Sequence, residues 1–310
     1  MTNGLLILIN SLNLSIRLFP TRHMSSQTVL RDAAPVTHYE NFPVASFLCP
    51  PHLRPAITAI YHFARTADDL ADEGDASAAQ RLADLSQYRA DLLATAQGHA
   101  HSRQWPQVFE PMAHILDRFQ LPLPLLTDLL DAFAQDVLFT AEQRRYATDA
   151  ELHDYCTRSA NPVGRLLLHL YGISDDESLA QSDQICTALQ LINFWQDVSV
   201  DVPRGRWYPS QQTMARFGVT DADLQPQSTS TDAALLIAYY AAESRTMMLN
   251  GSKLPCRIPG RAGWELRLVV QGGLRILDKI EALQFATWRV RPKLTAWDAV
   301  VMLWRALWMR

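Results

Sequence analysis

Acidic residues recur at helical spacing in two separate parts of the chain. In the first part, Asp68 and Asp72 lie four residues apart, so that on a helix one carboxylate stands above the other on the same face. Like charges at this spacing repel each other and cost stability unless a cation neutralises them. Carboxylate oxygens suit Mg²⁺, which keeps several waters and commonly bridges protein carboxylates to a substrate phosphate. A solvated acidic end of a helix is the alternative interpretation.

A second polar stripe lies further along the chain. Asn193, Asp197 and Asp201 follow one another at four-residue spacing among Leu, Ile, Phe and Trp. Burying amide and carboxylate groups among such side chains is costly unless they bind something. Arg204 and Arg206 come next, and guanidinium groups hold phosphate through paired hydrogen bonds. The two stripes together predict facing helices that hold a diphosphate through bridging Mg²⁺. The expected metal ligands are Asp68, Asp72, Asn193, Asp197 and Asp201.

A segment between the stripes, YCTRSANPVGR, combines small residues with a proline. Small side chains at Ser159, Ala160 and Gly164 allow a helix to approach a neighbour or a ligand closely. Pro162 lacks a backbone donor and should kink or open that helix. Tyr155 then becomes a polar group at the wall of a cavity, although the spacing alone favours a structural tyrosine almost as strongly.

These side chains must be positioned by helices. Hydrophobic residues recur at helical spacing along most of the chain, and strand-like alternation bounded by turns is missing. Gly or Pro separates the segments. The sequence therefore predicts an all-α fold, a single bundle of about eight or nine helices. The expected helices cover residues 52–74, 78–97, 107–119, 124–143, 149–172, 182–202, 231–249, 262–287 and 295–309.

Composition excludes several function classes. The chain has 310 residues, with 28 Lys+Arg against 32 Asp+Glu and a formal net charge of −4, so we expect no nucleic-acid partner. No GxGxxG or GxxxxGK[ST] motif occurs, which argues against a nucleotide site. The four cysteines lie far apart without a CxxC pair, a pattern typical of reduced, mostly buried thiols in the cytoplasm.

The two ends of the chain differ from the middle. Residues 1–37 form an N-terminal extension whose apolar run is too short and too polar to span a bilayer, and we expect Met24 to be the initiator. Residues 293–310 predict an amphipathic helix with Arg305 near its end, which suits peripheral contact with the inner membrane. Packing on the protein's own core is the alternative. The face of this helix carries Trp297, Val300, Val301, Trp304 and Trp308.

The three segments, in this order, resemble the squalene and phytoene synthase family of head-to-head prenyl transferases over roughly residues 38–292. The acidic pair at 68 and 72 matches the family's first DxxxD motif, the 155–164 segment matches its YCxxxAGxVG segment, and residues 193–208 match its second signature. The resemblance implies an isoprenoid-synthase-like bundle with a central active-site cavity, a catalytic domain over 38–292, a prenyl diphosphate substrate and Mg²⁺ as cofactor.

Within the family, residues 38–47 (HYENFPVASF) and 193–197 (NFWQD) are similar to the bacterial hopanoid-pathway branch. That branch converts presqualene diphosphate and water to hydroxysqualene and diphosphate, without a reductant. The alternatives are presqualene diphosphate, squalene and phytoene synthases, which condense two prenyl diphosphates such as farnesyl diphosphate and share these aspartates. Functional coupling to a presqualene diphosphate synthase and to a hydroxysqualene-reducing enzyme is then expected.

The resemblance also implies a role for each matched residue. Arg165 has two possible interpretations, a contact with the diphosphate and a surface salt bridge. Each matched aromatic residue either lines a hydrocarbon channel or belongs to the core. The implied catalytic residues are Asp68, Asp72, Tyr155, Asn193, Asp197 and Asp201. The implied substrate-binding residues are Phe47, Tyr61, Arg65, Arg165, Gln190, Phe194, Arg206 and Tyr208.

Two other function classes rest on the residues alone. His114 and the pair His153-Asp154 are the elements of a helical His-Asp phosphohydrolase, but the further His and distal Asp that such a site needs are not evident. A non-catalytic helical scaffold is the second, and acidic stripes beside Phe and Trp argue against it.

Overall fold

The computed structural model describes residues 49–309, and every regular element in that range is helical, as predicted. The predicted extension at 1–37 and Phe47 lie outside the described residues. The helices are α2 (Arg54–Asp72), α3 (Ala78–Ala96), α4 (Pro106–Phe119), α5 (Leu123–Glu142), α6 (Asp149–Ser159), α7 (Asn161–Leu170), α8 (Asp176–Gln196), α9 (Val198–Asp201), α10 (Gln211–Arg216), α11 (Thr231–Gly251), α12 (Leu254–Arg257), α13 (Gly260–Ala282) and α14 (Ala296–Leu307), with 3-10 turns at Val202–Arg204 and Asp221–Leu224.

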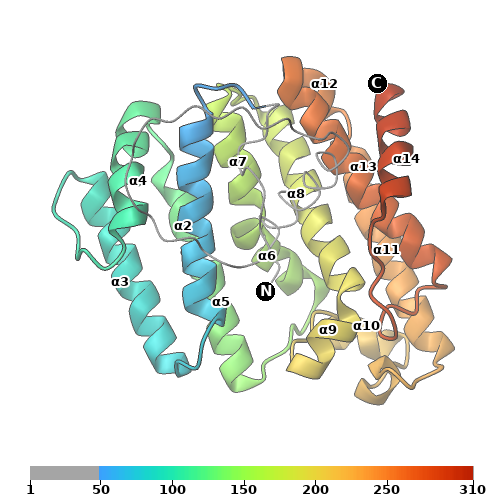
Figure 1. The fold of residues 1–310 in the computed structure, drawn as a ribbon. Helices are drawn as coiled ribbons and strands as arrows, with labels where there is room; N and C mark the ends of the chain where they lie inside the picture. Colours follow the sequence, from blue (N-terminus) through green and yellow to red (C-terminus); the bar gives the residue numbers. More distant parts are fainter. Residues whose placement is uncertain (1–48, 310) are drawn as a thin grey trace.

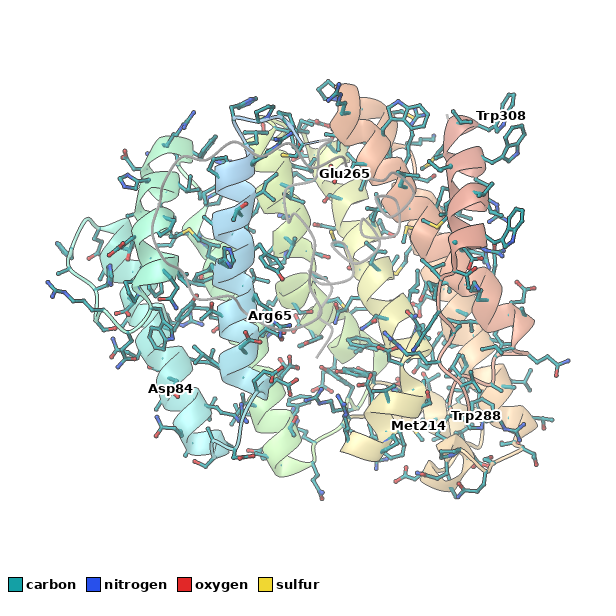
Figure 2. All side chains as sticks on the ribbon, in the orientation of Figure 1. Arg65, Asp84, Met214, Glu265, Trp288 and Trp308 are labelled. Carbon is teal, nitrogen blue, oxygen red and sulfur yellow. The ribbon has the colours of Figure 1, made fainter. Side chains whose placement is uncertain are left out.

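Helix α8 lies at the centre of the bundle. It packs against α6 and α7 on one side and against α11 and α13 on the other (Figure 1). Helices α2, α3 and α4 form a second group, and α5 joins it to the centre through contacts with α2, α3, α6 and α7. Buried apolar side chains from α2 to α13 form one continuous core, and side chains fill the space between the helices (Figure 2).

The predicted helix over 149–172 is divided into α6 and α7 at Ala160. Pro162 is the cause, because it has no N–H to donate to the carbonyl four residues earlier. This confirms the opening predicted at the proline. The chain changes direction at this point, so α7 can run against α8 while α6 keeps its contact with α5.

The predicted helix over 182–202 is interrupted at Asp197, which ends α8 before the short α9 begins. The Ser199 N–H donates to Thr287 O at 3.2 Å instead of to a carbonyl one turn earlier in its own helix. The helix also begins earlier than predicted, because the Asp175 side chain accepts a hydrogen bond from Ser178 N and caps its first turn.

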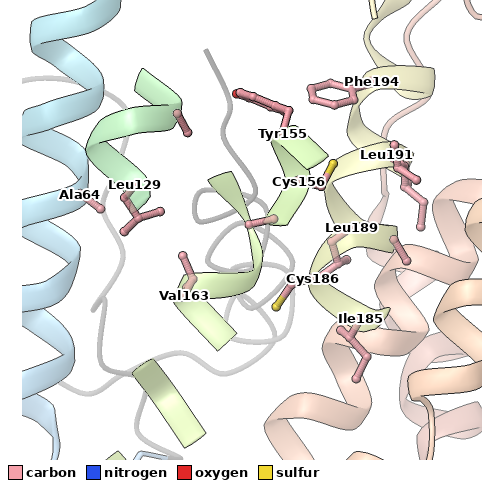
Figure 3. Packing of buried hydrophobic residues seen from close by; sticks show 14 of the residues in the cluster. Ala64, Leu129, Tyr155, Cys156, Val163, Ile185, Cys186, Leu189, Leu191 and Phe194 are labelled. Atoms are coloured by element: carbon pink, nitrogen blue, oxygen red, sulfur yellow. The ribbon is translucent and has the colours of Figure 1, made fainter. Parts of the chain in front are cut away.

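Gly164 lets α7 approach α8 closely, as the small residues of this segment predicted. A Cβ added at Gly164 would lie 2.3 Å from Ser182 Oγ and 2.6 Å from Cys186 Sγ. Figure 3 shows Cys186 on the side of α8 that faces α7. We therefore expect Gly164→Ala to lower the free energy of unfolding by about 1–3 kcal/mol, as overpacking does in other cores, in urea denaturation followed by circular dichroism. The double variant Gly164→Ala/Ser182→Ala should recover part of that loss, and an unchanged stability of the single variant would contradict the close approach.

Candidate active site

The first acidic stripe lies on the inner face of α2. Asp68 is only 3 % exposed, and Tyr61, two turns earlier on the same face, is also buried. Burial raises the pKa of the Asp68 carboxyl to about 7, and the nearby charge of Asp72 acts in the same direction. Arg65 pairs with its own helix, with Nη2 2.7 Å from Asp69 Oδ1, so its contact with a diphosphate stays a prediction.

The second stripe follows one face of α8. Gln190, Asn193 and Phe194 are buried there, with Asn193 three and Phe194 four residues after Gln190. In the part of the chain that the structure describes, the buried Gln190 Oε1 has no hydrogen-bond partner. Asp197 follows at the end of the helix, where its carboxylate is held by Arg291, with Nη2 3.0 Å from Oδ2. Sequence reasoning missed Arg291, because nothing near position 291 indicates a partner 94 residues earlier in the chain.

A tight turn carries Arg206 back over the second stripe. Pro203 lies in a 3-10 turn, and Gly205 adopts a positive φ of 77°, a conformation that favours glycine. The Arg206 N–H then donates to Asp201 O at 3.0 Å. Burial raises the pKa of the Asp201 carboxyl to about 7, and the charge of Asp197 adds to this effect.

Arg206 also joins the two stripes, because its Nη2 pairs with the Asp72 carboxylate of α2. Its Nε and Nη1 atoms are buried and have no hydrogen-bond partner among residues 49–309. Leaving buried donors unsatisfied costs about 1–3 kcal/mol each, so an anionic ligand that accepts both would be bound favourably. The structure therefore brings Asp72 of α2 and Asp201 of α9 close to the Arg206 guanidinium. The Nε and Nη1 donors of this guanidinium are available to a ligand.

A buried carboxyl on α5, Asp136, was missed by sequence reasoning. Tyr155 on α6 donates its O–H to Asp136 Oδ2 at 2.8 Å. Burial raises the pKa of Asp136 to about 7, and the charge of Asp68 adds to it, while the hydrogen bond from Tyr155 opposes it. An aspartate within the apolar run AFAQDVLF was the available signal.

Three further aromatic rings, those of Tyr146, Phe194 and Tyr208, form a cluster with Tyr155. Phe194 stacks on Tyr208 with ring centroids 3.6 Å apart, and Tyr155 lies beside Phe194 (Figure 3), with Tyr146 5.9 Å from Tyr155. Burial raises the pKa of all three tyrosines well above the usual value, so they remain protonated donors at neutral pH. An adjacent cavity of about 30 Å³, room for about one or two waters, is lined by Asp136, Phe139, Thr140, Arg144, Tyr146, Gly205, Arg206, Trp207 and Tyr208.

Arg165 lies away from this cluster. Its guanidinium forms two hydrogen bonds with Asp183 of α8, at 2.9 Å from Nε and 2.6 Å from Nη2. Its side chain is partly exposed. This ion pair agrees with the interpretation as a surface salt bridge, and a contact of Arg165 with the diphosphate stays a prediction. The side chain projects from α7 toward the first half of α8, one to two turns before the polar face begins.

The oxygen donors fit Mg²⁺ that arrives with a phosphate ligand, rather than a preformed cage. Within residues 49–309, no three His, Cys, Asp or Glu side chains stand close enough to share one ion. Asp72 and Asp197 hold Arg206 and Arg291, and Asp68 Oδ2 lies 3.5 Å from Arg65 Nη1. Mg²⁺ in proteins commonly uses one or two carboxylates, several waters and a substrate phosphate. Asp68 and Asp201, one from each stripe, supply carboxylates of this kind, and the Asp201 carboxyl feels the charge of Arg206.

The raised pKa of Asp136 predicts a pH dependence of stability. The folded state favours the protonated carboxyl, so it binds more protons than the unfolded state between about pH 4 and 7, and stability falls as pH rises through that window. Asp136→Asn keeps the shape without the charge. Its stability relative to the unsubstituted protein should therefore increase with pH up to about 7, by at most about 1.4 kcal/mol per pH unit, and then level off. Urea denaturation of metal-free protein at several pH values measures this difference, and a difference independent of pH would contradict it.

The chain resembles known proteins over most of its length. Residues 36–298 match the squalene/phytoene synthase family. A hydroxysqualene synthase from Zymomonas mobilis subsp. mobilis is 36% identical over 74% of this chain and 75% of its own. A presqualene diphosphate synthase from Rhodopseudomonas palustris is 28% identical over 85% of this chain and 91% of its own. The structure of squalene synthase HpnC from Alicyclobacillus acidocaldarius has a TM-score of 0.72 at 30% identity, over 91% of this chain and 99% of its own, which confirms the predicted isoprenoid-synthase-like bundle. The chain therefore belongs to the squalene/phytoene synthase family of enzymes.

Proposed function

We propose that this chain is an Mg²⁺-dependent hydroxysqualene synthase, which converts presqualene diphosphate and water to hydroxysqualene and diphosphate. The observation that carries the proposal is the Arg206 guanidinium, which is buried between the two acidic stripes with two donors unpaired. A diphosphate supplies the acceptors that these donors lack. The choice of this reaction within the family is supported by the relatives named hydroxysqualene synthase, at 31% to 36% identity.

Ionisation of the substrate breaks its C–O bond and leaves negative charge on the diphosphate. Arg206 holds the departing oxygens through Nε and Nη1, which are already oriented by the pairing of Nη2 with Asp72. Mg²⁺ held by Asp68 and Asp201, with Asp72, Asn193 and Asp197 as the further proposed ligands, would supply additional positive charge. Donors fixed before the reaction stabilise the leaving group without reorganisation.

The carbocation that remains needs a π-rich surface and one water. The stacked rings of Phe194 and Tyr208 offer such a surface. The cavity beside Asp136 has room for the water. When the water oxygen bonds to the carbocation, one proton leaves, and Asp136, with a pKa of about 7, is suited to accept it near neutral pH. Tyr155 orients the carboxylate through its hydrogen bond.

Synthesis of presqualene diphosphate from two farnesyl diphosphates is the second candidate. Relatives named presqualene diphosphate synthase are 28% to 32% identical to this chain, and one of them matches 85% of it. Both reactions begin with ionisation of a prenyl diphosphate, so the same acidic stripes serve either one. The two reactions differ in the nucleophile that reacts with the carbocation. In hydroxysqualene synthesis it is water, and in presqualene diphosphate synthesis it is a second prenyl chain.

The proposal also places the enzyme in a sequence of reactions. A presqualene diphosphate synthase would supply the substrate, and a hydroxysqualene-reducing enzyme would consume the product. Both molecules are long hydrocarbons that partition into lipid, so the proposal includes a cytoplasmic enzyme with peripheral contact with the inner membrane. Across residues 49–309, no helix is long and apolar enough to cross a bilayer.

Product analysis tests the proposed reaction. Purified full-length protein with Mg²⁺ and without NADPH is given presqualene diphosphate in one reaction and farnesyl diphosphate in another, and lipids are identified by mass spectrometry. Hydroxysqualene from the first reaction and no product from the second is the expected result. Accumulation of presqualene diphosphate in the second reaction would favour the second candidate, and activity that survives exhaustive chelation would overturn the Mg²⁺ dependence.

A further inference from the structure

Helix α14 has two chemically different faces, and only one of them packs on the bundle. Ala299, Met302 and Ala306 are buried against α13. The opposite face is apolar as well, although it is exposed, and at 100° per residue its members form a continuous stripe. These side chains are between 40 % and 79 % exposed: Trp297, Val300, Leu303, Trp304, Leu307 and Trp308. Figure 2 shows Trp308 at the outer edge of the molecule, projecting away from the other helices.

The helix is fixed to the bundle by charged side chains of α13. At its beginning, buried Asp298 is held by Arg275 at 2.6 Å and by Lys279 at 2.8 Å. Near its end, Arg305 pairs with Asp278 at 2.7 Å, and Arg267 donates to Ala306 O at 3.2 Å. These ion pairs and hydrogen bonds with α13 fix the orientation of α14, so that the apolar stripe faces away from the bundle.

The composition of the stripe favours a lipid surface over a protein partner. Three of its six members are tryptophans, the side chain enriched at the boundary between headgroups and hydrocarbon. Trp264 of α13 is also exposed, and the Arg267 guanidinium lies 5.0 Å from its ring centre. Contiguous apolar patches of several hundred Å² are uncommon on monomeric proteins and usually mark interaction sites.

The positive charge of the chain segment that contains α14 favours anionic lipids over neutral ones. Residues 286–310 contain five basic residues and one acidic residue, a net charge of 5 − 1 = +4, whereas the whole chain carries −4. Two of these cations, Arg291 and Arg305, are paired with Asp197 and Asp278 outside the segment. A basic segment beside an apolar helix is attracted to anionic headgroups, by about 1 kcal/mol for each basic residue near the surface. Pairing of the stripe with a second copy of itself would bring two such basic segments together, which is unfavourable. The charged residues are Arg289, Arg291, Lys293, Asp298, Arg305 and Arg310.

We propose that the outer face of α14, with the adjacent Trp264, docks the enzyme on an anionic phospholipid bilayer. The helix lies parallel to the surface, with its tryptophans at the level of the headgroups and its packed side toward the protein. This inference deepens the proposed function, since a lipid surface is where presqualene diphosphate and hydroxysqualene would be exchanged. Its structural basis, however, does not depend on which prenyl diphosphate is consumed.

Vesicle sedimentation of the full chain tests the docking. One set of vesicles contains phosphatidylcholine alone, and the other contains phosphatidylcholine with about one third phosphatidylglycerol, at low salt. We expect at least tenfold tighter binding to the anionic vesicles, weakened by added salt, and at least a tenfold loss for Trp297→Gln/Trp304→Gln/Trp308→Gln. The matched control is Leu235→Gln/Leu249→Gln, which alters two exposed leucines of α11 and should bind as the unsubstituted protein does.

The outcomes separate docking from the proposed reaction. Equal binding of the triple variant and the unsubstituted chain, or no binding of either, would overturn the docking. A dimer that the triple variant converts to a monomer in sedimentation velocity would show that a second copy covers the face instead. Turnover of detergent-dispersed substrate should be unchanged in the triple variant. Protein that binds vesicles but converts no prenyl diphosphate would contradict the reaction and leave the docking intact.

Discussion

Replacing Asp68 by asparagine should reduce kcat/KM by at least about 10³-fold, which corresponds to about 4 kcal/mol of lost transition-state stabilisation, while the protein stays folded. The carboxylate is buried on the inner face of α2, one turn before Asp72, which pairs with Arg206. An amide of the same shape keeps the packing and removes the charge that a metal ion requires. Asp201→Asn on α9 should behave alike, because each stripe supplies one such carboxylate.

The stability of the Asp68→Asn variant distinguishes a functional carboxylate from a structural one. Burial and the nearby Asp72 disfavour the charged form, so at pH 8 without metal the variant should unfold at higher urea than the unsubstituted protein. Addition of Mg²⁺ with inorganic diphosphate should stabilise the unsubstituted protein more than the variant. The matched control is Asp84→Asn on α3, whose partly exposed carboxylate accepts a hydrogen bond from Gln80 of the same helix. Retention of half the activity in Asp68→Asn, or an equal loss in the control, would contradict the role of the stripe.

Most of the long helices were predictable because they bury apolar residues that recur in the sequence at helical spacing, whereas the short α10 and α12 were not predicted. The break between α6 and α7 was predictable too, since Pro162 acts through its own backbone. The break at Asp197 was not, because it depends on a hydrogen bond between Ser199 and Thr287, two segments that meet only in the folded chain. Local signals in a sequence specify local structure, and tertiary contacts modify it at the places where distant segments meet.

The same distinction separates the site residues that were predicted from those that were missed. Asp68 and Asp72 share one helix face, so four-residue spacing identified them as a pair. Asp136 has no acidic neighbour on the inner face of α5, and its importance comes from Tyr155 on another helix. Arg291 likewise acquires its role only through Asp197. Arg165 shows the converse, since a cation near a predicted site is paired with an aspartate outside it.

Arg206→Lys should lower kcat/KM by at least about 10²- to 10³-fold, which is the effect of removing a single preorganised donor at a developing negative charge. Lysine keeps the positive charge, and it can still pair with Asp72. It lacks the planar set of donors, so the oxygens that Nε and Nη1 would bind lose two hydrogen bonds. The loss therefore measures the geometry of the guanidinium rather than its charge.

Arg204→Lys provides the matched control, because Arg204 lies two residues earlier on the same turn and is exposed. Its activity should stay within about twofold of the unsubstituted enzyme, as is usual for an exposed substitution that costs less than about 0.5 kcal/mol. The binding of inorganic diphosphate in the presence of Mg²⁺, measured by isothermal titration calorimetry, should weaken in Arg206→Lys and not in Arg204→Lys. If both variants lose activity equally, general positive charge on the turn explains the effect. If only Arg206→Lys loses activity and diphosphate affinity together, the unpaired donors between the two stripes are the part of the site that holds the leaving group.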